Sequence, residues 1–351
     1  MPPVRVGTDR DGRLRGLMNR TLRRLAVVTT VFTYLLVAVG GLVRGTESGL
    51  GCPDWPRCHG RFIPPLEYHA IIEYSHRATA SVVIWLTVAL AVVAVRNRRQ
   101  LSRRAFTLAV IPLPIVLSQA ILGAIVVALD LKAESVVAHL LVAMSLVAVL
   151  ISLVVEVAPA GSPLSAPTPG AGADRSFAAV ASAVAAAALV LILLGSYVSG
   201  RHAGLAFRTW PLFDGHVVPA YHGLAPDLHF AHRVVAAVVA IAIFALARLV
   251  RRRPQARPVT LMVRAAAALI GVEVLLGAGN VWTRLSAVTR TAHLATGALI
   301  WAVLFIAARL AWRLPAGEPA RPAPADGAGG GSELDLRRPS VETAETAGST
   351  R

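Results

Sequence analysis

The feature that most constrains this chain is a series of eight apolar runs, each longer than 18 residues and with few charged side chains. A run of that length is typical of a helix that crosses the ~30 Å hydrocarbon core of a bilayer. The sequence therefore predicts an all-α integral membrane protein with eight transmembrane helices. Pro112 and Pro114 are expected to bend the third of them. The expected spans are residues 25–43, 70–95, 106–129, 135–157, 177–198, 228–250, 261–281 and 288–312.

The charged residues indicate how the helices are oriented. The chain has 35 Lys and Arg against 19 Asp and Glu, but its arginines cluster between the apolar runs, so nucleic acid is not an expected partner. Short loops rich in Arg stay in the cytoplasm. Segments 96–104 and 248–257 are therefore expected there, together with the Arg-rich N-terminal segment. This predicts a multi-pass protein of the cell membrane, surrounded by lipid, with both termini cytoplasmic and the loops after the odd-numbered spans facing outward.

The two halves of the chain align with each other at an offset of 154 to 156 residues. Matches at one offset indicate duplication of a structural unit. Each unit holds four spans, an even number, so both copies should point the same way. This predicts two four-helix bundles related by a parallel internal repeat. The matched residues include Gly45/Gly200, Trp55/Trp210, Pro64/Pro219, His76/His232, Arg77/Arg233, Gln119/Glu273, Gly123/Gly277 and His139/His293.

The expected organisation has five parts. Residues 1–24 form a cytoplasmic N-terminal segment and residues 25–157 the N-terminal half. A linker rich in Pro, Gly, Ala and Ser covers 158–176, and the C-terminal half covers 177–312. The composition of residues 313–351 predicts a disordered cytoplasmic tail.

Four histidines occupy repeat-related positions near the outward ends of their spans: His76, His139, His232 and His293. Two imidazoles from facing helices are a common way for a bundle to hold a haem iron. The simpler interpretation, that each histidine hydrogen-bonds a carbonyl or lies at the interface, accounts poorly for four matched positions. A di-iron site would need a second Glu-x-x-His motif, and a zinc site would need a third and a fourth ligand. The pattern therefore predicts two haem sites.

The two halves differ in a way that suggests chemistry at one site only. Glu73 lies one helical turn before His76, whereas His229 takes the equivalent place before His232. A carboxylate beside a haem edge could shuttle protons or stabilise a cation. An i,i+4 salt bridge from Glu73 to Arg77 is an equally good interpretation of the spacing.

Arginines follow two of the histidines directly. Arg77 follows His76 and Arg233 follows His232. Either arginine could pair with haem propionates. The alternative is that each side chain extends to the membrane interface.

Cys52 and Cys58 are the only two cysteines of the chain, and both fall in the first outward loop. An outward loop faces an oxidising compartment, so a disulfide between them is expected. It could act as a structural staple or have a redox role, and the spacing of the two residues does not decide between these.

The segment GLVRGTESGLGCPDWPRCHG at residues 41–60, followed by EYSHR at 73–77, resembles the haem A synthase family of cytochrome oxidase assembly. The resemblance covers residues 25–312. It implies that haem O is converted to haem A by oxidation of the C8 methyl group to a formyl group through successive hydroxylations. It also implies that His76 and His139 serve the substrate haem with Glu73 as the important acid, and that His232 and His293 bind a haem b cofactor.

The same resemblance implies contact with the haem O synthase that supplies the substrate, and assembly into homo-oligomers. Cys52 and Cys58 match the cysteine pair of the family. The electron-transfer partner is not identified by any of these motifs.

Two other functions compete with haem modification. A di-haem cytochrome b that carries electrons or oxidises quinol would usually hold its haems at different depths, whereas all four histidines are expected near the outer side. A transporter built on a parallel repeat would not need four matched histidines.

Overall fold

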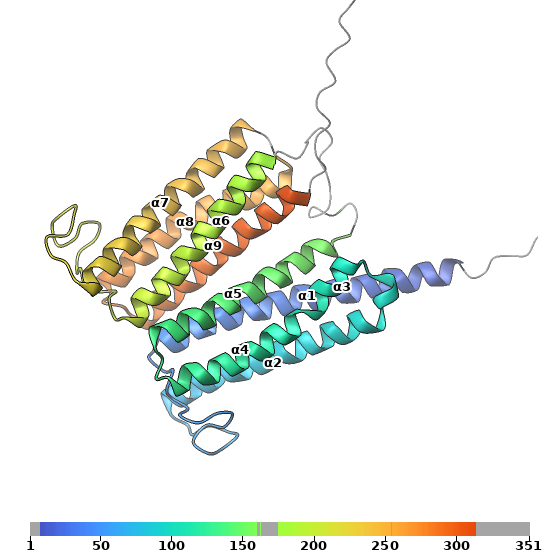
Figure 1. The fold of residues 1–351 in the computed structure, drawn as a ribbon, viewed down its shortest axis with the longest axis horizontal. Coiled ribbons are helices and arrows are strands. Elements are labelled where there is room, and N and C mark those ends of the chain that lie inside the picture. Colours follow the sequence, from blue (N-terminus) through green and yellow to red (C-terminus); the bar gives the residue numbers. More distant parts are fainter. Residues whose placement is uncertain (1–7, 160–161, 163–174, 254, 314–351) are drawn as a thin grey trace, which may run out of the picture. The chain divides into compact units, whose positions relative to one another are not determined.

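The computed structural model describes residues 8–159, 162, 175–253 and 255–313, with side chains from Arg20 onward. The expected tail lies outside these residues apart from Arg313, as does most of the expected linker. Within the described residues, helices alternate with short loops, and two isolated β-bridges are the only strand-like pairings. The helices are α1 (Thr8–Gly45), α2 (Tyr68–Arg96), η1 (Arg98–Gln100), α3 (Arg103–Val110), α4 (Pro112–Ala128), α5 (Ala133–Glu156), α6 (Arg175–Gly200), α7 (Leu224–Arg252), α8 (Arg257–Trp282) and α9 (Ala287–Arg313) (Figure 1).

Eight helical segments are long and apolar enough to cross a membrane, which agrees with the predicted number of spans. Each expected span falls within or close to one of them. The largest difference is at the N-terminus, where α1 begins at Thr8 and so extends through most of the expected polar segment. The part of α1 that qualifies as a span starts at Arg20.

The third span, in which two prolines were expected to cause a bend, is interrupted at Ile111, between α3 and α4. Pro112 and Pro114 have no backbone N–H, so the helical hydrogen-bond ladder cannot continue through them. Ile111 itself keeps helical backbone angles, with φ −63° and ψ −25°. Both helices therefore belong to one candidate span, Arg103–Ala128, with a local break.

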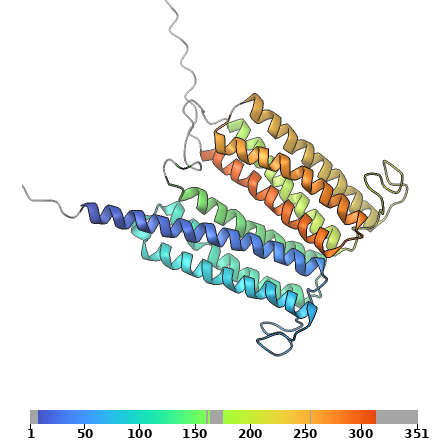
Figure 2. The same cartoon turned by 180° about the vertical axis from the view of Figure 1, so that it is seen from behind.

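Helices α1 to α5 contact one another, as do helices α6 to α9, and the two groups meet along α1, α5, α6 and α9 (Figures 1 and 2). One buried apolar cluster runs through α6, α7, α8 and α9 and continues onto α5. A second cluster joins α1 to α5. The core is thus continuous across the contact between the two groups.

Small side chains allow close helix packing in this core. Ala178, Ala181, Ala185 and Ala188 recur at spacings of three and four residues, share one face of α6, and are buried. Helix α6 packs on α9, which buries several alanines of its own. In membranes, small residues are typical of such interfaces because they let helix backbones approach closely.

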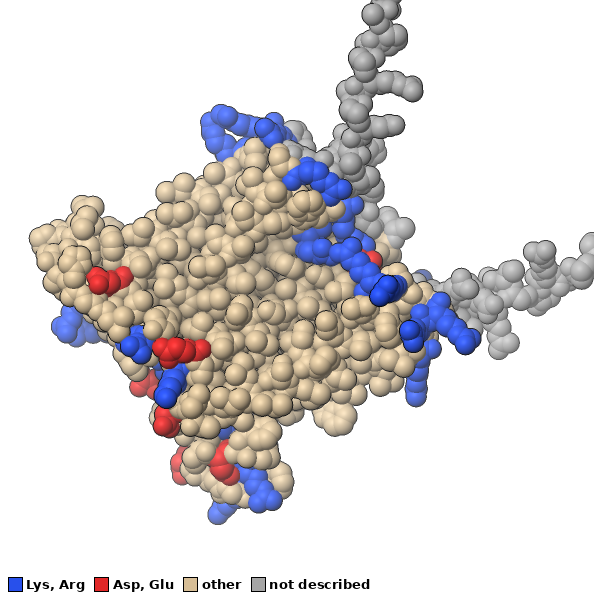
Figure 3. Space-filling model, viewed as in Figure 1, with Lys and Arg blue, Asp and Glu red and all other residues tan. Residues whose placement is uncertain are grey.

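The two long loops, residues 46–67 and 201–223, lie at the same end of the helices, which we call the loop end (Figure 1). On the face seen in Figure 3, charged side chains gather at the two ends of the helices, with an almost uncharged band between them. Large apolar side chains such as Trp85, Ile241 and Leu275 are more than 60% exposed. A surface of this kind is suited to contact with lipid.

Candidate functional site

The four predicted histidines all lie near the loop end. Helices α2, α5, α7 and α9 begin there, and each carries its histidine as the seventh or ninth residue, so the imidazoles lie at similar depths. The helix pairs that hold them are α2 with α5 and α7 with α9.

His232 and His293 face each other across a gap of definite size. Their ring centroids are 6.4 Å apart and their planes are inclined by 78°. A metal ion bound at roughly 2 Å by a nitrogen of each ring would separate the two ring centres by roughly 6 Å. The structure therefore brings His232 and His293 together, as the sequence predicted. His76 and His139 hold the matched positions on α2 and α5 and lie near enough for their charges to interact.

None of the four rings makes a hydrogen bond within the described part of the chain, and all four Nδ1 atoms are buried without an aligned partner. A buried polar atom without a partner costs about 1–3 kcal/mol. The simpler interpretation, in which each histidine is satisfied by a backbone carbonyl, therefore does not fit. The rings are available for a ligand.

Each ring packs against a glycine of the neighbouring helix. A Cβ atom placed on any of these glycines would lie 3.0–3.4 Å from the Cε1 atom of the histidine, tighter than an ordinary contact. A side chain there would therefore push the ring out of position. The four pairs are Gly40 on α1 with His76, Gly123 on α4 with His139, Gly195 on α6 with His232 and Gly277 on α8 with His293.

This role of the glycines was not predicted from the sequence. Gly123 and Gly277 were matched in the repeat without a function, and Gly40 and Gly195 were not singled out. Their signal is visible, however, because Gly40 and Gly195 lie in apolar spans and are separated by 155 residues, the offset of the repeat.

The described residues do not form a metal site built only from protein ligands. Among the described residues, no group of three or more His, Cys, Asp or Glu side chains could hold a metal ion. This leaves the zinc and di-iron alternatives without a ligand set there. A haem would fit the histidine pairs, because the two histidines of a pair would hold its iron and the porphyrin would supply the remaining ligands.

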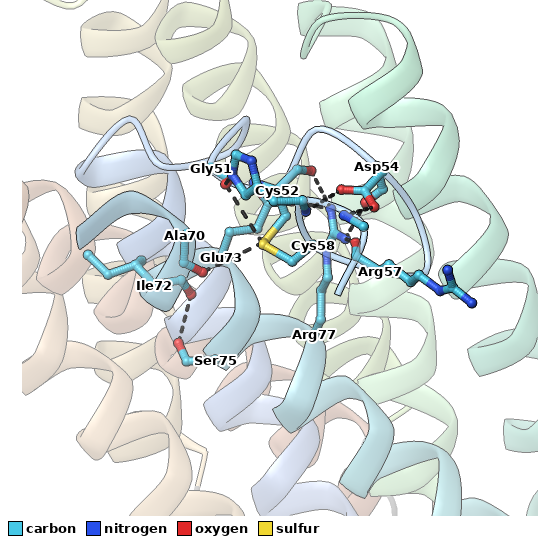
Figure 4. The surroundings of a disulfide bond; sticks show 12 residues. Gly51, Cys52, Asp54, Arg57, Cys58, Ala70, Ile72, Glu73, Ser75 and Arg77 are labelled. Carbon is cyan, nitrogen blue, oxygen red and sulfur yellow. Dashed lines mark hydrogen bonds and ion pairs between the residues drawn. A yellow bond between two sulfur atoms is a disulfide. The ribbon is translucent and has the colours of Figure 1, made fainter. Parts of the chain in front are cut away.

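Glu73 and Arg77 form the salt bridge that their spacing allowed. The Glu73 carboxylate is only 4% exposed, and its Oε1 accepts a hydrogen bond of 2.6 Å from Arg77 Nη2. Its Oε2 accepts the backbone N–H of Cys52 at 3.0 Å (Figure 4). Both oxygens are thus engaged, and Glu73 ties α2 to the first long loop.

Arg77 also connects α2 to the first long loop. Its two terminal nitrogens donate to the carbonyl oxygens of Cys52, Asp54 and Arg57 at 2.7–2.8 Å (Figure 4). With the bond to Glu73, four of the five guanidinium N–H groups are used. The arrangement holds the loop over the start of α2, and only the Nε–H remains for another acceptor.

The expected disulfide between Cys52 and Cys58 is formed, and both residues are buried. The disulfide closes the same loop segment whose carbonyl oxygens accept hydrogen bonds from Arg77 (Figure 4). The bond, the glutamate and the arginine thus act on the same few residues of the loop.

In the other half, His229 occupies the place of Glu73 and makes corresponding contacts. It is 5% exposed, with Nδ1 3.3 Å from the backbone N–H of Phe207 and Nε2 3.1 Å from the Nε of Arg233. A neutral imidazole has one acceptor nitrogen, so only one of these contacts can be a full hydrogen bond. Phe207 and Phe213 stack edge to face at 5.0 Å where the first half has its disulfide.

Arg233 is less completely engaged than Arg77. Its Nη1 donates to the carbonyl of Thr209 at 3.0 Å, and its guanidinium lies 5.1 Å from the centre of the Phe213 ring. Its Nη2 is buried without a hydrogen-bond partner in the described residues. This atom could donate a hydrogen bond to an anionic partner without displacing an existing contact.

Carboxylates order both long loops outside the helices. Asp54 accepts the backbone N–H of Gly60 at 2.9 Å and that of His59 at 2.6 Å, and these bonds lower the pKa of Asp54. At Asp214, desolvation opposes the shift, but hydrogen bonds from Tyr221 and the 208–209 segment lower the pKa overall. These groups shape the loops and lie outside the histidine pairs.

Known proteins resemble this chain over most of its length. A heme A synthase of Bacillus pumilus is 33% identical over 234 residues, which cover 65% of this chain and 74% of the relative. A heme A synthase of Symbiobacterium thermophilum is 29% identical over 293 residues, 81% of this chain and 94% of the relative. Residues 23–305 match a family described as cytochrome oxidase assembly protein. With its eight candidate spans and paired histidines, the chain belongs to the COX15-CtaA family of cytochrome oxidase assembly proteins.

Proposed function

We propose that this protein is a haem A synthase, a membrane oxidoreductase that converts haem O to haem A. In this reaction the C8 methyl group of the porphyrin becomes a formyl group through successive hydroxylations. Membership of the family and the name of the relatives support the activity. The observation that carries the proposal is the spacing of 6.4 Å between two imidazoles that make no hydrogen bond of their own.

The two histidine pairs are assigned different haems. His232 and His293 would hold haem b as a resident cofactor, and His76 and His139 would hold the substrate haem. When bound, haem b supplies one-electron redox chemistry. The glycines beside the rings support both assignments, because each ring packs against a glycine and its Nδ1 atom makes no formed hydrogen bond among the described residues.

Reaction at the N-terminal pair alone is favoured by the difference between Glu73 and His229. Glu73 is the acid that the substrate site would use, lying one turn from His76 and held by Arg77 and Cys52. Its bonds would keep the carboxylate in one orientation and away from bulk water. The C-terminal half has no carboxylate in this place.

For the haem propionates, the two arginines are not equal candidates. Arg233 is favoured, because its buried Nη2 has no partner among the described residues and a carboxylate would satisfy it. Arg77 could offer only its Nε–H without giving up a bond to the loop.

The architecture that goes with this function is a pair of four-helix units, residues 25–157 and 177–312, related by a parallel repeat. The 155-residue match of the β-bridge Cys58–Arg61 with the bridge Phe213–His216 supports the repeat. The loop end is proposed to face outward and the arginine-rich end inward, by the positive-inside rule. Contact with a haem O synthase and homo-oligomer formation also belong to the proposal.

The competing function is that of a di-haem cytochrome b that carries electrons across the membrane. Such a protein would gain from haems at opposite depths. Here, each of the four histidines lies seven to nine residues into a helix that begins at the loop end. That placement favours haem modification over transmembrane electron transfer.

Pigment analysis tests the proposal. The protein would be purified from cells that make haem O, and its extracted haems would be separated by chromatography. We expect haem b together with haem O or haem A, and haem A in the cells only when the protein is present. Haem b alone, with no haem A formed in cells supplied with haem O, would refute the proposed activity.

A further inference from the structure

Glu273 is a partly buried acid that the proposed reaction does not use. It lies within α8, its side chain is 15% exposed, and its Oε2 is buried without a hydrogen-bond partner among the described residues. Its Oε1 is 3.1 Å from His293 Nδ1. The ring N–H is not aligned with this oxygen, so the contact is a close approach rather than a formed hydrogen bond. An ionisable side chain inside a membrane helix is costly and usually has a function.

The neighbouring helix makes room for this carboxylate. A Cβ atom on Gly297 of α9 would lie 2.9 Å from Glu273 Oε1, which is closer than real contacts of this kind. Any other residue at position 297 would therefore force the carboxylate away from His293. Glycine here, one turn along α9 from that histidine, keeps space for the acid beside the ring.

The N-terminal half lacks this arrangement. The residues 154 positions earlier are Gln119 and Ala143, which replace Glu273 and Gly297 together. The Gln119 amide donates to the backbone oxygen of His139 at 3.0 Å, so it holds the helix and not the ring. Among the described residues, His293 is the only one of the four histidines whose Nδ1 atom lies within 4 Å of a carboxylate oxygen.

We infer that Glu273 is a positioning residue for His293 that makes the two haem sites electronically different, an inference that rests on the proposed haem b site. Metal-binding histidines usually donate their second ring N–H to a carboxylate, carbonyl or water, which fixes the tautomer and makes the ligand more basic. Glu273 is the acceptor placed to do this. A more basic ligand and a nearby negative charge both stabilise ferric over ferrous iron, so Glu273 lowers the reduction potential of the C-terminal haem.

The test is a spectroelectrochemical titration of holoprotein purified from cells that make no haem O, so that haem b is the pigment under observation. Glu273→Gln keeps the shape of the side chain and removes its charge. We expect haem b to remain bound and the ferrous-to-ferric ratio at a fixed potential to rise at least tenfold, about 59 mV for a one-electron couple. The EPR g values of the low-spin ferric haem should change as well.

A second variant provides an independent test in case Glu273→Gln does not fold. Gly297→Ala leaves the charge in the protein but displaces the flexible end of Glu273 from His293. It should shift the potential in the same direction. Gly271→Ala, on the same helix as Glu273 with nothing within 4 Å of the added Cβ, is the control and should leave the potential unchanged.

The outcomes separate this inference from the proposed function. Haem b bound in both variants, with the potential and the g values of the unaltered protein, would overturn the role of Glu273 and leave the proposed function standing. Absence of haem b from the unaltered protein would refute the proposed haem b site, and with it this inference.

Discussion

The glycine beside His232 offers a sharp prediction. A Cβ on Gly195 would lie 3.0 Å from His232 Cε1 and 3.5 Å from its Nδ1, so the ring must retreat by a few tenths of an ångström in Gly195→Ala. The partner ring of His293 is fixed on α9, and the spacing of 6.4 Å between the rings would change. The substitution adds one methyl group and alters no charge.

The expected magnitude follows from two opposing effects. Replacing Gly by Ala inside a helix is favourable by about 1 kcal/mol. Overpacking at a filled position costs about 1–3 kcal/mol. If the overpacking cost applies only to the haem-bound conformation, haem affinity drops roughly 5- to 140-fold. Gly271→Ala should stabilise its helix in the same way without overpacking, because nothing lies within 4 Å of its added Cβ.

The assay is the haem b content per purified polypeptide, measured with thermal unfolding of the same samples in detergent. Gly195→Ala should lose haem b and melt earlier in its holo form, whereas Gly271→Ala should keep haem b and melt at the same temperature or higher. Full haem b content with an unchanged absorption spectrum in Gly195→Ala would refute the idea that the glycine sets the position of the ring.

Three further predictions concern the loop end. Glu73→Gln should retain both haems but form no haem A, because the side chain keeps its shape and loses its charge; haem A yield at the unaltered level would remove Glu73 from the reaction. Serine at both Cys52 and Cys58 should lower stability by about 2 kcal/mol, the value for a short closed segment, and reductant should then have no further effect on the melting temperature of this variant. The lowered pKa of Asp54 means that its contribution to loop order is present above about pH 4 and is lost as the pH falls through the folded-state pKa. Hydrogen exchange of the Gly60 and His59 amides at acidic pH should show this loss, and Asp54→Asn should be insensitive to pH over the same range.

Much of the helical fold follows from sequence patterns of local composition and from the internal repeat. The eight spans, a distortion of the third span at its prolines and the disulfide were all predicted, because apolar length, missing backbone N–H groups and cysteine location act locally. The pairing of His232 with His293 was also predicted, since similar depth and a repeated position bring two helices of one bundle together.

What the sequence did not reveal are contacts between helices. The use of Gly195 or Gly297 depends on which face of a helix meets its neighbour, and an apolar run on all sides carries little information about that rotation. The direction of Arg77 was left open for a related reason. Its side chain can reach a propionate, the interface or the loop, and only the folded loop presents the three carbonyls that it binds. Likewise, the likeness of His229 to Glu73 lies in their partners, not in their chemistry.

The most direct test of two inequivalent haem sites is the pigment content of paired histidine variants made in cells that supply haem O. Alanine at His76 and His139 should remove haem O and haem A while haem b stays bound. Alanine at His232 and His293 should remove haem b. Loss of haem b from the first variant with retention in the second, or the same pigments in both, would contradict the assignment of the two halves.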